Sequence, residues 1–410
     1  MGYTCHHLPV DISAIGTVRR WSMLAIALTA TLCANVFING VAFLIPTLHT
    51  ERGLDLAEAG FISALPSFGM VVTLIAWGYL VDRFGERLVL AVGSTLTAAA
   101  GFAAASADSL VAVGVFLFLG GMAAASSNSA SGRLVVGWFP PDQRGLVMGI
   151  RQTAQPLGVG LGALVIPQLA ETRGVTAALL FPAVACTAAA VISAIGVLDP
   201  PRPPRAEAHA DDLANPYRGS STLWRIHAVS VLLVAPQCVI WTFTLVWLMT
   251  DRGWSAASAG AMVTVAQVLG AAGRIGAGRW SDKTGSRLHP IRTIAIGAAV
   301  AMGLLAVTDL MGSPLSIAVM VAASVITVSD NGLAFTAIAE LAGPFWSGRA
   351  LGTQNTSQLL TAGIVPPLFG ALITAAGFPL AFAVCAAFPL VALPLVPVDA
   401  DPLRRQRPTD

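Results

Sequence analysis

The sequence reads GYLVDRFGER from Gly78 to Arg87 and GRWSDKTGSR from Gly278 to Arg287, 200 residues further along. Glycine, aspartate, a basic residue, glycine and arginine fall at the same places in both stretches. Upstream, Thr50-Glu51-Arg52-Gly53 recurs at the same separation as Thr250-Asp251-Arg252-Gly253. No gap is needed between the two matches. In an apolar chain, such a duplication is typical of secondary transporters built from parallel repeats.

The composition indicates a membrane protein. Of 410 residues, 55% are hydrophobic and 11% are charged, against roughly 25% charged residues in a soluble domain. Apolar runs of about 20 residues recur from end to end, each long enough to cross the hydrocarbon layer as a helix. We therefore expect an all-α polytopic protein with two pseudo-symmetric six-helix bundles. The expected spans are 21–47, 57–81, 88–107, 109–138, 145–170, 175–198, 223–249, 255–279, 291–311, 314–341, 350–376 and 378–397.

A hydrophilic stretch separates the two sets of spans. Residues 199–222 are rich in proline, charge and small polar side chains, which is typical of an exposed linker. We expect this linker to be cytoplasmic and to join an N-terminal bundle, residues 1–198, to a C-terminal bundle, residues 223–410.

The distribution of positive charge predicts the orientation. With both termini inside, 17 of the 23 Lys and Arg residues fall on the cytoplasmic side, and three fall outside: Arg52, Arg173 and Arg252. The positive-inside rule therefore favours cytoplasmic termini. One Lys beside 22 Arg is typical of a GC-rich bacterial genome, so we expect a bacterial inner membrane.

The sequence does not indicate an enzyme, a metal-binding protein or a nucleic-acid-binding protein. No pair of histidines with ligand spacing within a span, nucleophile elbow, phosphate loop or metal-ligand cluster is present, so we expect neither an enzyme nor a metal site. The five cysteines have no CxxC spacing and lie mostly within apolar runs, as small core residues do. A net charge of +2 argues against a nucleic-acid partner. The expected partners are a small solute and the lipid bilayer, with no cofactor, a monomeric assembly and the proton gradient as energy source.

Both ten-residue stretches resemble the signature loops of the major facilitator superfamily, which follow the second helix and its counterpart in the second half. The resemblance covers essentially the whole chain. It implies two halves that rock around a central cavity, with alternating access and with these loops as the inner gate. The gating residues that we expect are Gly78, Asp82, Arg83, Gly85, Arg87, Gly278, Asp282, Lys283, Gly285, Arg287, Glu340 and Arg349.

Elementary physics explains these residue types. The glycines allow a tight turn and a close approach of helices. Asp82 and Asp282 each lie where a carboxylate can meet a helix N-terminus or an arginine across the interface between the halves. Such a latch can form in one conformation and break in another. Glu340 and Arg349 flank a turn and are expected to join the second latch with Arg287. Alternatively, these charges only anchor the membrane surface and set the topology.

A second repeat has a separation of 203 residues. Ser126-Ser127-Asn128 matches Ser329-Asp330-Asn331, which equates the fourth span with the tenth. In the superfamily these helices line the cavity, so the resemblance implies that Asn128 and Asn331 face each other across it. An amide both donates and accepts hydrogen bonds, which suits a polar solute. Hydrogen bonding between helices is the alternative.

Arg274 and Asp330 are charges of the second half whose counterparts in the first half are uncharged. Arg274 in the eighth span corresponds to Leu74, and Asp330 in the tenth corresponds to Ser127. Charges within a membrane are costly and are usually functional or paired. We expect Arg274 to hold a substrate carboxylate and Asp330 to carry a proton, because a buried carboxyl group takes up a proton more readily than an exposed one. The alternative is a salt bridge from Arg274 to Asp330 or Glu340.

Gly273-Arg274, followed by Gly278 and Asp282, resembles the eighth helix of the monocarboxylate porters, where this arginine binds the substrate anion. The resemblance implies a proton-coupled transporter of a small organic anion such as a monocarboxylate. The chain departs from these porters at Gly270, where they often carry an aspartate, and in its first span, which lacks their lysine.

Two more arginines lie within predicted spans. Arg151 is in the first third of the fifth span and either lines the inner cavity, snorkels, or pairs at an interface. Arg133 is about one helical turn from the cytoplasmic end of its span, and we expect it at the gate or at the surface.

Other functions remain as alternatives. Drug:proton antiporters of the same superfamily usually carry an arginine in the fourth helix, which is missing from residues 116–121, and a Gly-Pro pair in the fifth, where Gly162 is followed by Ala163. Nitrate porters use an arginine in both the second and the eighth helix, and Leu74 leaves only one. A sensor or scaffold that moves no solute is expected to lose the latch charges, which are present here.

Overall fold

The computed structural model describes residues 15–45, 47, 56–201, 207–208 and 210–405, and every regular element in these ranges is a helix. This confirms the all-α prediction. The first copy of the upstream repeat, Thr50 to Gly53, which includes the predicted outer-loop Arg52, lies outside the described residues.

The described helices of the first half cover most of the predicted spans but divide them differently. The first is α1 (Thr17–Gly40), which continues as the 3₁₀ helix η2 (Val41–Leu44). The others are α3 (Leu56–Phe84), α4 (Glu86–Ala105), α5 (Leu110–Ala124), α6 (Ser126–Trp138), α7 (Arg144–Arg151) and α8 (Ala154–Gly196).

Helices of the second half follow in a similar order after a short α9 (Ala210–Leu213), with the single helix α15 in place of α7 and α8. They are α10 (Thr222–Thr250), α11 (Ala256–Thr284), α12 (Leu288–Leu310), α13 (Leu315–Ile326), α14 (Asn331–Ala342) and α15 (Ser347–Ala392). The chain closes with η3 (Leu393–Leu395), η4 (Val398–Ala400) and α16 (Pro402–Arg405).

The longest helix of each half contains a break. Gly174 in α8 has a φ of 82° and Gly377 in α15 has a φ of 81°, a conformation that glycine adopts without a Cβ clash. At 43 and 46 residues, α8 and α15 are each about twice the length needed to cross a bilayer. Within the described ranges, nine helices are long and apolar enough to span a membrane, and two of these contain the breaks. The predicted count of twelve spans and the predicted bundle boundaries stay predictions.

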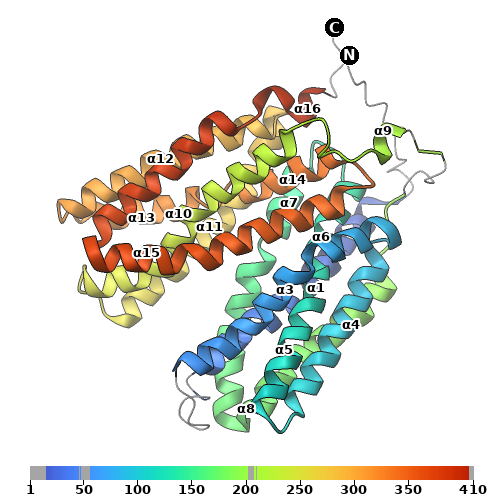
Figure 1. Cartoon of the computed structure of the whole chain (residues 1–410), viewed down its shortest axis with the longest axis horizontal. Coiled ribbons are helices and arrows are strands. Elements are labelled where there is room, and N and C mark those ends of the chain that lie inside the picture. Colours follow the sequence, from blue (N-terminus) through green and yellow to red (C-terminus); the bar gives the residue numbers. More distant parts are fainter. Residues whose placement is uncertain (1–14, 46, 48–55, 202–206, 209, 406–410) are drawn as a thin grey trace.

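The two halves touch through glycines of the signature stretches. Figure 1 shows two helical bundles that meet on the side of the termini and diverge on the opposite side. A Cβ on Gly78 of α3 would collide with the backbone oxygen of Gly348 in α15. Likewise, a Cβ on Gly278 of α11 would collide with the backbone oxygen of Gly145 in α7. Each signature glycine therefore permits a backbone-to-backbone crossing between the halves.

Candidate functional site

A central cavity of about 120 Å³ lies between the two halves. Its polar lining consists mainly of amide side chains, with two arginines and a threonine. These polar residues are Thr31, Asn35, Asn128, Arg151, Gln152, Gln155, Gln237, Arg274, Asn331, Asn355 and Gln358. Met70, Trp241 and Phe335 contribute apolar surface. No carboxylate is among the residues described as lining it.

Arg151 lines this cavity at the end of α7 and is 2% exposed. Its Nε donates to Ser131 Oγ at 2.9 Å, and its Nη2 donates to Asn128 O at 2.7 Å. Its Nη1 donates to Gln152 Oε1 at 2.9 Å, and the guanidinium carbon lies 5.8 Å from the centre of the Phe335 ring. All these partners are neutral. Arg151 thus lines the cavity and also bonds to the neighbouring helix α6, and its role in binding stays a prediction.

Arg274 reaches the same cavity from α11 and is 3% exposed. Its Nη1 donates to Gln152 O at 3.0 Å, and its guanidinium carbon lies 5.5 Å from the centre of the Trp241 ring. Its Nε has no hydrogen-bond partner among the described residues. No ion pair joins Arg274 to Asp330 or Glu340 in the described part of the chain, although Asp330 is close enough to act on it electrostatically.

Asp330 lies just before α14, where the helical path from α13 is interrupted. It is 1% exposed, and its Oδ2 has no hydrogen-bond partner within the described ranges. The next residue, Asn331, lines the cavity. Asp330 is thus a buried carboxyl group next in sequence to a cavity-lining amide, and it interacts electrostatically with Arg274.

Asn128 and Asn331 both line the cavity, one from each half. Arg151 Nη2 is 3.3 Å from Asn128 Oδ1, and Asn331 Nδ2 donates to Gln237 Oε1 at 3.0 Å. Gln358 Nε2 donates to Asn331 Oδ1 at 3.2 Å. The two amides therefore line the cavity, which is the position expected for contact with a polar solute. They also form hydrogen bonds to neighbouring helices, which is the alternative.

The first latch joins α3 to the start of α15. Asp82 Oδ1 accepts from the backbone N–H of Gly348 at 2.8 Å, and Asp82 Oδ2 accepts from Arg349 Nε at 3.0 Å. Arg133 contributes from α6, with its Nη1 3.5 Å from Asp82 Oδ1 and its Nε donating to Ser347 Oγ at 3.0 Å. An aspartate of one half thus caps a helix of the other, as expected for this carboxylate.

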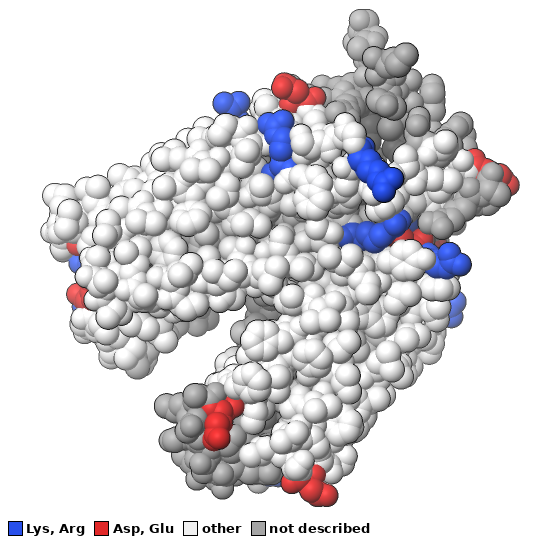
Figure 2. All heavy atoms as spheres, viewed as in Figure 1, with Lys and Arg blue, Asp and Glu red and all other residues white. Residues whose placement is uncertain are grey.

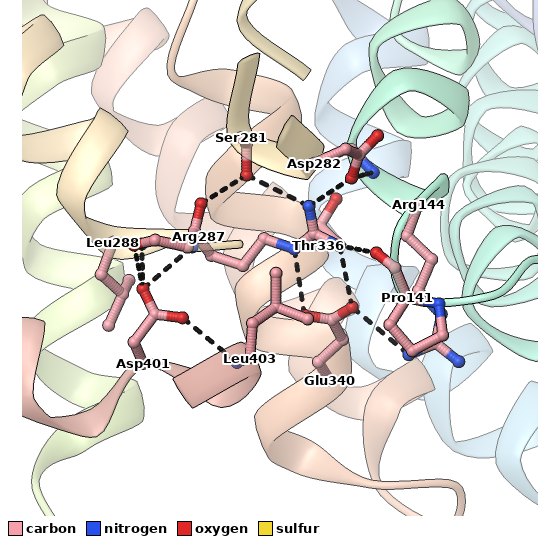
Figure 3. A network of polar contacts seen from close by, with 12 residues as sticks. Pro141, Arg144, Ser281, Asp282, Arg287, Leu288, Thr336, Glu340, Asp401 and Leu403 are labelled. Carbon is pink, nitrogen blue, oxygen red and sulfur yellow. Dashed lines mark hydrogen bonds and ion pairs between the residues drawn. The ribbon is translucent and has the colours of Figure 1, made fainter. Parts of the chain in front are cut away.

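The second latch joins α11 to the start of α7 (Figure 3). Asp282 accepts from the backbone N–H groups of Gly145 and Leu146 at 2.9 and 2.8 Å, and from Arg287 Nη1 at 2.6 Å. Glu340 lies 3.2 Å from Arg287 Nε through its Oε2. Arg144 of the other half approaches Glu340 Oε1 at 3.3 Å.

One latch residue lies elsewhere than expected. Glu340 joins Arg287 in the second latch, but Arg349 lies in the first latch with Asp82. The cause is tertiary: α15 starts against α3, so a residue in its first turn faces Asp82.

Three motif residues lie outside both latches. Arg83 and Lys283 are exposed, and the Arg83 guanidinium carbon lies 5.6 Å from the centre of the Phe84 ring. Arg87 is exposed too, and its Nε donates to Ala194 O at 2.7 Å. Gly85 and Gly285 have φ values of 99° and 60° and form the turns that follow. The exposed positions of Arg83, Lys283 and Arg87 fit residues that anchor the membrane surface better than residues that form a gate.

The sequence reasoning missed two capping aspartates. Asp199 Oδ1 accepts from Arg87 N at 2.8 Å, at the start of α4. Asp401 Oδ2 accepts from Arg287 N and Leu288 N, both at 2.9 Å, at the start of α12. Each aspartate directly precedes a proline, and this repeated Asp-Pro pair was a signal that could have identified them. Arg144 was also missed, and nothing in its local sequence marks it.

The comparisons with known proteins agree with this architecture. The family model described as Major Facilitator Superfamily matches residues 27–366. The chain belongs to the major facilitator superfamily. It is 61% identical over 383 residues to an uncharacterised MFS-type transporter of Mycobacterium tuberculosis, covering 93% of this chain and 86% of that one. The chain is accordingly a multi-pass membrane transporter and not an enzyme.

Two more distant similarities cover most of this major facilitator chain. A probable galactarate/D-glucarate transporter of Bacillus subtilis is 23% identical over 367 residues, covering 81% of this chain and 80% of that protein. The solved structure of the proton:xylose symporter XylE superposes with a TM-score of 0.76 at 15% identity, covering 92% of this chain and 95% of that one. This structural likeness establishes the fold alone.

Proposed function

We propose that this major facilitator protein carries a small organic anion, held in the central cavity by Arg274 and Arg151. The observation that carries the proposal is that both guanidinium groups are buried beside the cavity and form no ion pair in the described part of the chain. A buried charge without a counter-charge is costly, and a bound carboxylate supplies that counter-charge bidentately.

The rest of the lining supports a polar acid over a purely apolar one. Amide side chains donate and accept hydrogen bonds, so they suit hydroxyl groups as well as carboxylates. The name of the Bacillus subtilis relative, a probable galactarate/D-glucarate transporter, agrees with a hydroxylated organic acid. A lipophilic cation, the cargo expected of an efflux antiporter, would lie against two arginines and be repelled.

Asp330 is the proposed proton carrier. Two observations support this proposal: its Oδ2 has no partner within the described ranges, and Arg274 acts on it electrostatically. Protonation of Asp330 would remove its attraction for Arg274 and leave that guanidinium to the substrate. The proton gradient then drives solute movement without any cofactor.

The proposed cycle is alternating access, with the two latches as the gate on the side of the termini. Figure 2 shows a wide groove between the halves on the opposite side, and basic side chains gathered near the termini. By the positive-inside rule, that distribution favours cytoplasmic termini in the inner membrane. In this orientation the closed latches leave the cavity facing outward, and rocking of the halves would break them.

The test is proton flux in proteoliposomes challenged with a panel of small organic acids. We expect at least one acid to drive proton entry in the wild type, and Arg274→Ala and Asp330→Asn to abolish it. Arg292→Ala, an exposed arginine on α12, is the matched control and should behave as the wild type. Proton exit driven by lipophilic cations, with no response to any acid, would replace this proposal by the efflux antiporter.

A further inference from the structure

One buried histidine plays no part in the site described above. His227 lies in the second turn of α10 and is 4% exposed. Its Nε2 is 2.9 Å from the hydroxyl of Tyr217 in the linker, and its Nδ1 is 2.6 Å from Gln354 Oε1 in α15. Both ring nitrogens therefore have protein partners, and the imidazole connects the linker to a helix of the second half.

Polar contacts continue from His227 to the cavity. Gln354 Nε2 donates to Ser230 Oγ, which also accepts from Gln358 Nε2 at 2.9 Å. Gln358 in turn donates to Asn331 Oδ1 at 3.2 Å, and Gln358 and Asn331 both line the cavity. The chain of contacts thus runs from the wall of the substrate cavity to the face that carries the termini.

At its other end, the chain reaches the first latch. The Tyr217 hydroxyl lies against Thr353, and Arg349 and Asp82 are close enough to act on it electrostatically. Burial raises the pKa of this hydroxyl to about 12, so at neutral pH it keeps its proton and serves as a donor. With Tyr217 donating to Nε2, the neutral imidazole donates from Nδ1 to Gln354 and both nitrogens are satisfied.

A second proton on His227 would disturb this arrangement. Both nitrogens of an imidazolium ion are donors, so Tyr217 would have to turn its own proton away, toward a neighbour such as Thr353. No carboxylate is among the described contacts of the ring, whose other neighbour is Trp224. Two charged groups of the first latch, Arg349 and Asp82, act electrostatically on Tyr217, the partner of the ring. The protonation state of His227 is therefore linked both to the latch and to the cavity amides.

Only the second half of the repeat has a histidine at this position. At a separation of 200 residues its counterpart is Ala27, and at 203 residues the counterpart of Gln354 is Arg151. The first half thus has a permanent charge where the second half has a neutral amide bonded to a titratable ring. We propose that His227 is a second proton-binding residue of the transport cycle, acting between the cavity and the Asp82–Arg349 latch.

The proposal for His227 rests on the proposed transport function. Two measurements distinguish a failure of one from a failure of the other. The first is the pH profile of organic-acid uptake in proteoliposomes between about pH 5 and 8, the range in which histidine titrates. His227→Gln keeps a hydrogen-bonding side chain without a titratable ring and is expected to lose the pH dependence that His227 supplies. His289→Gln, at the other described histidine, is the matched control and should keep the wild-type profile.

The second readout needs no substrate. Cys238 lines the cavity, and its rate of modification by a methanethiosulfonate reagent reports how open the cavity is, with Cys238→Ser as the blank. The ratio of the His227→Gln rate to the wild-type rate is expected to change with pH. A constant ratio, with superimposable uptake profiles, would overturn the role of His227 even if an acid is transported.

If no acid is transported, the function proposed above fails while the labelling ratio still tests His227. If His227→Gln does not fold, Tyr217→Phe keeps the ring, removes its donor and is expected to shift the pH dependence of Cys238 labelling. An unshifted dependence in Tyr217→Phe would likewise overturn the proposal.

Discussion

Arg133 and Arg287 occupy non-equivalent positions in the two repeats, yet they hold equivalent places in the two latches. Arg133 Nη2 donates to Pro344 O, and Arg287 Nη2 donates to Pro141 O. The two prolines are themselves repeat-equivalent, 203 residues apart. Each arginine also faces the signature aspartate of its own half. The duplicated scaffold has therefore kept the geometry of the latch while one arginine is supplied from a different helix.

This relationship predicts unequal effects at Arg87 and Arg287, although the two are equivalent in the repeat. Arg287→Ala leaves Asp282 and Glu340 without their buried partner, which costs about 3–5 kcal/mol. Arg87 is exposed, so Arg87→Ala should cost less than about 1 kcal/mol. Thermal unfolding of the detergent-solubilised protein measures both, and equal losses would contradict the assignment.

Neutralising the latch aspartates should open the gate on the side of the termini. Asp82→Asn loses charge-assisted hydrogen bonds to Gly348 and Arg349, worth about 1.5–3 kcal/mol, or at least tenfold in the ratio of open to closed molecules. Spin labels at Arg83→Cys and Lys283→Cys, both exposed and outside the latches, measure the separation of the halves.

We expect a larger population at long separation in Asp82→Asn, and a larger one still with Asp282→Asn added. Asp108→Asn, an exposed aspartate outside both latches, is the control and should leave the distances unchanged. Identical distance distributions in the wild type and the double variant would mean that the latches do not hold the gate.

Close packing between the halves predicts a sharp contrast between two neighbouring glycines. A Cβ on Gly278 would collide with the backbone of Gly145, whereas a Cβ on Gly276 meets no atom within 4 Å. Gly278→Ala should therefore destabilise the protein by about 1–3 kcal/mol, while Gly276→Ala should be neutral or slightly stabilising. The midpoint of thermal unfolding decides between them, and a neutral Gly278→Ala would show that the crossing is looser than described.

The end of the second half opposite the termini has its own buried charge. Asp309 Oδ1 accepts from Trp247 Nε1 at 2.9 Å and pairs with Arg252. Arg252→Ala should cost about 1–3 kcal/mol because it leaves Asp309 buried with a single donor. Arg173→Ala, an exposed arginine, is the comparison and should have little effect. The double variant Arg252→Ala/Asp309→Asn should regain part of the lost stability, and failure to do so would argue against the pairing.

Many residues of the site could be predicted because short stretches of the sequence indicate them. Asp82 and Asp282 were identified by spacing, and the close-approach role of Gly78 and Gly278 follows from their lack of a Cβ. Arg274 was identified because a charge in an apolar span is rare. His227 carried no such signal, because a lone histidine in an apolar helix gives no indication of the helix it will face.

Apolar run length and the two repeats specify the all-helical, duplicated membrane fold, because both are properties of the chain alone. Most of the charge pairings depend on the tertiary structure. Arg349 pairs with Asp82 because α15 starts against α3, and Arg151 and Arg274 converge on Gln152 because α7 crosses α11. Such pairings depend on helix crossings between residues more than 100 positions apart, which no local pattern in the sequence specifies.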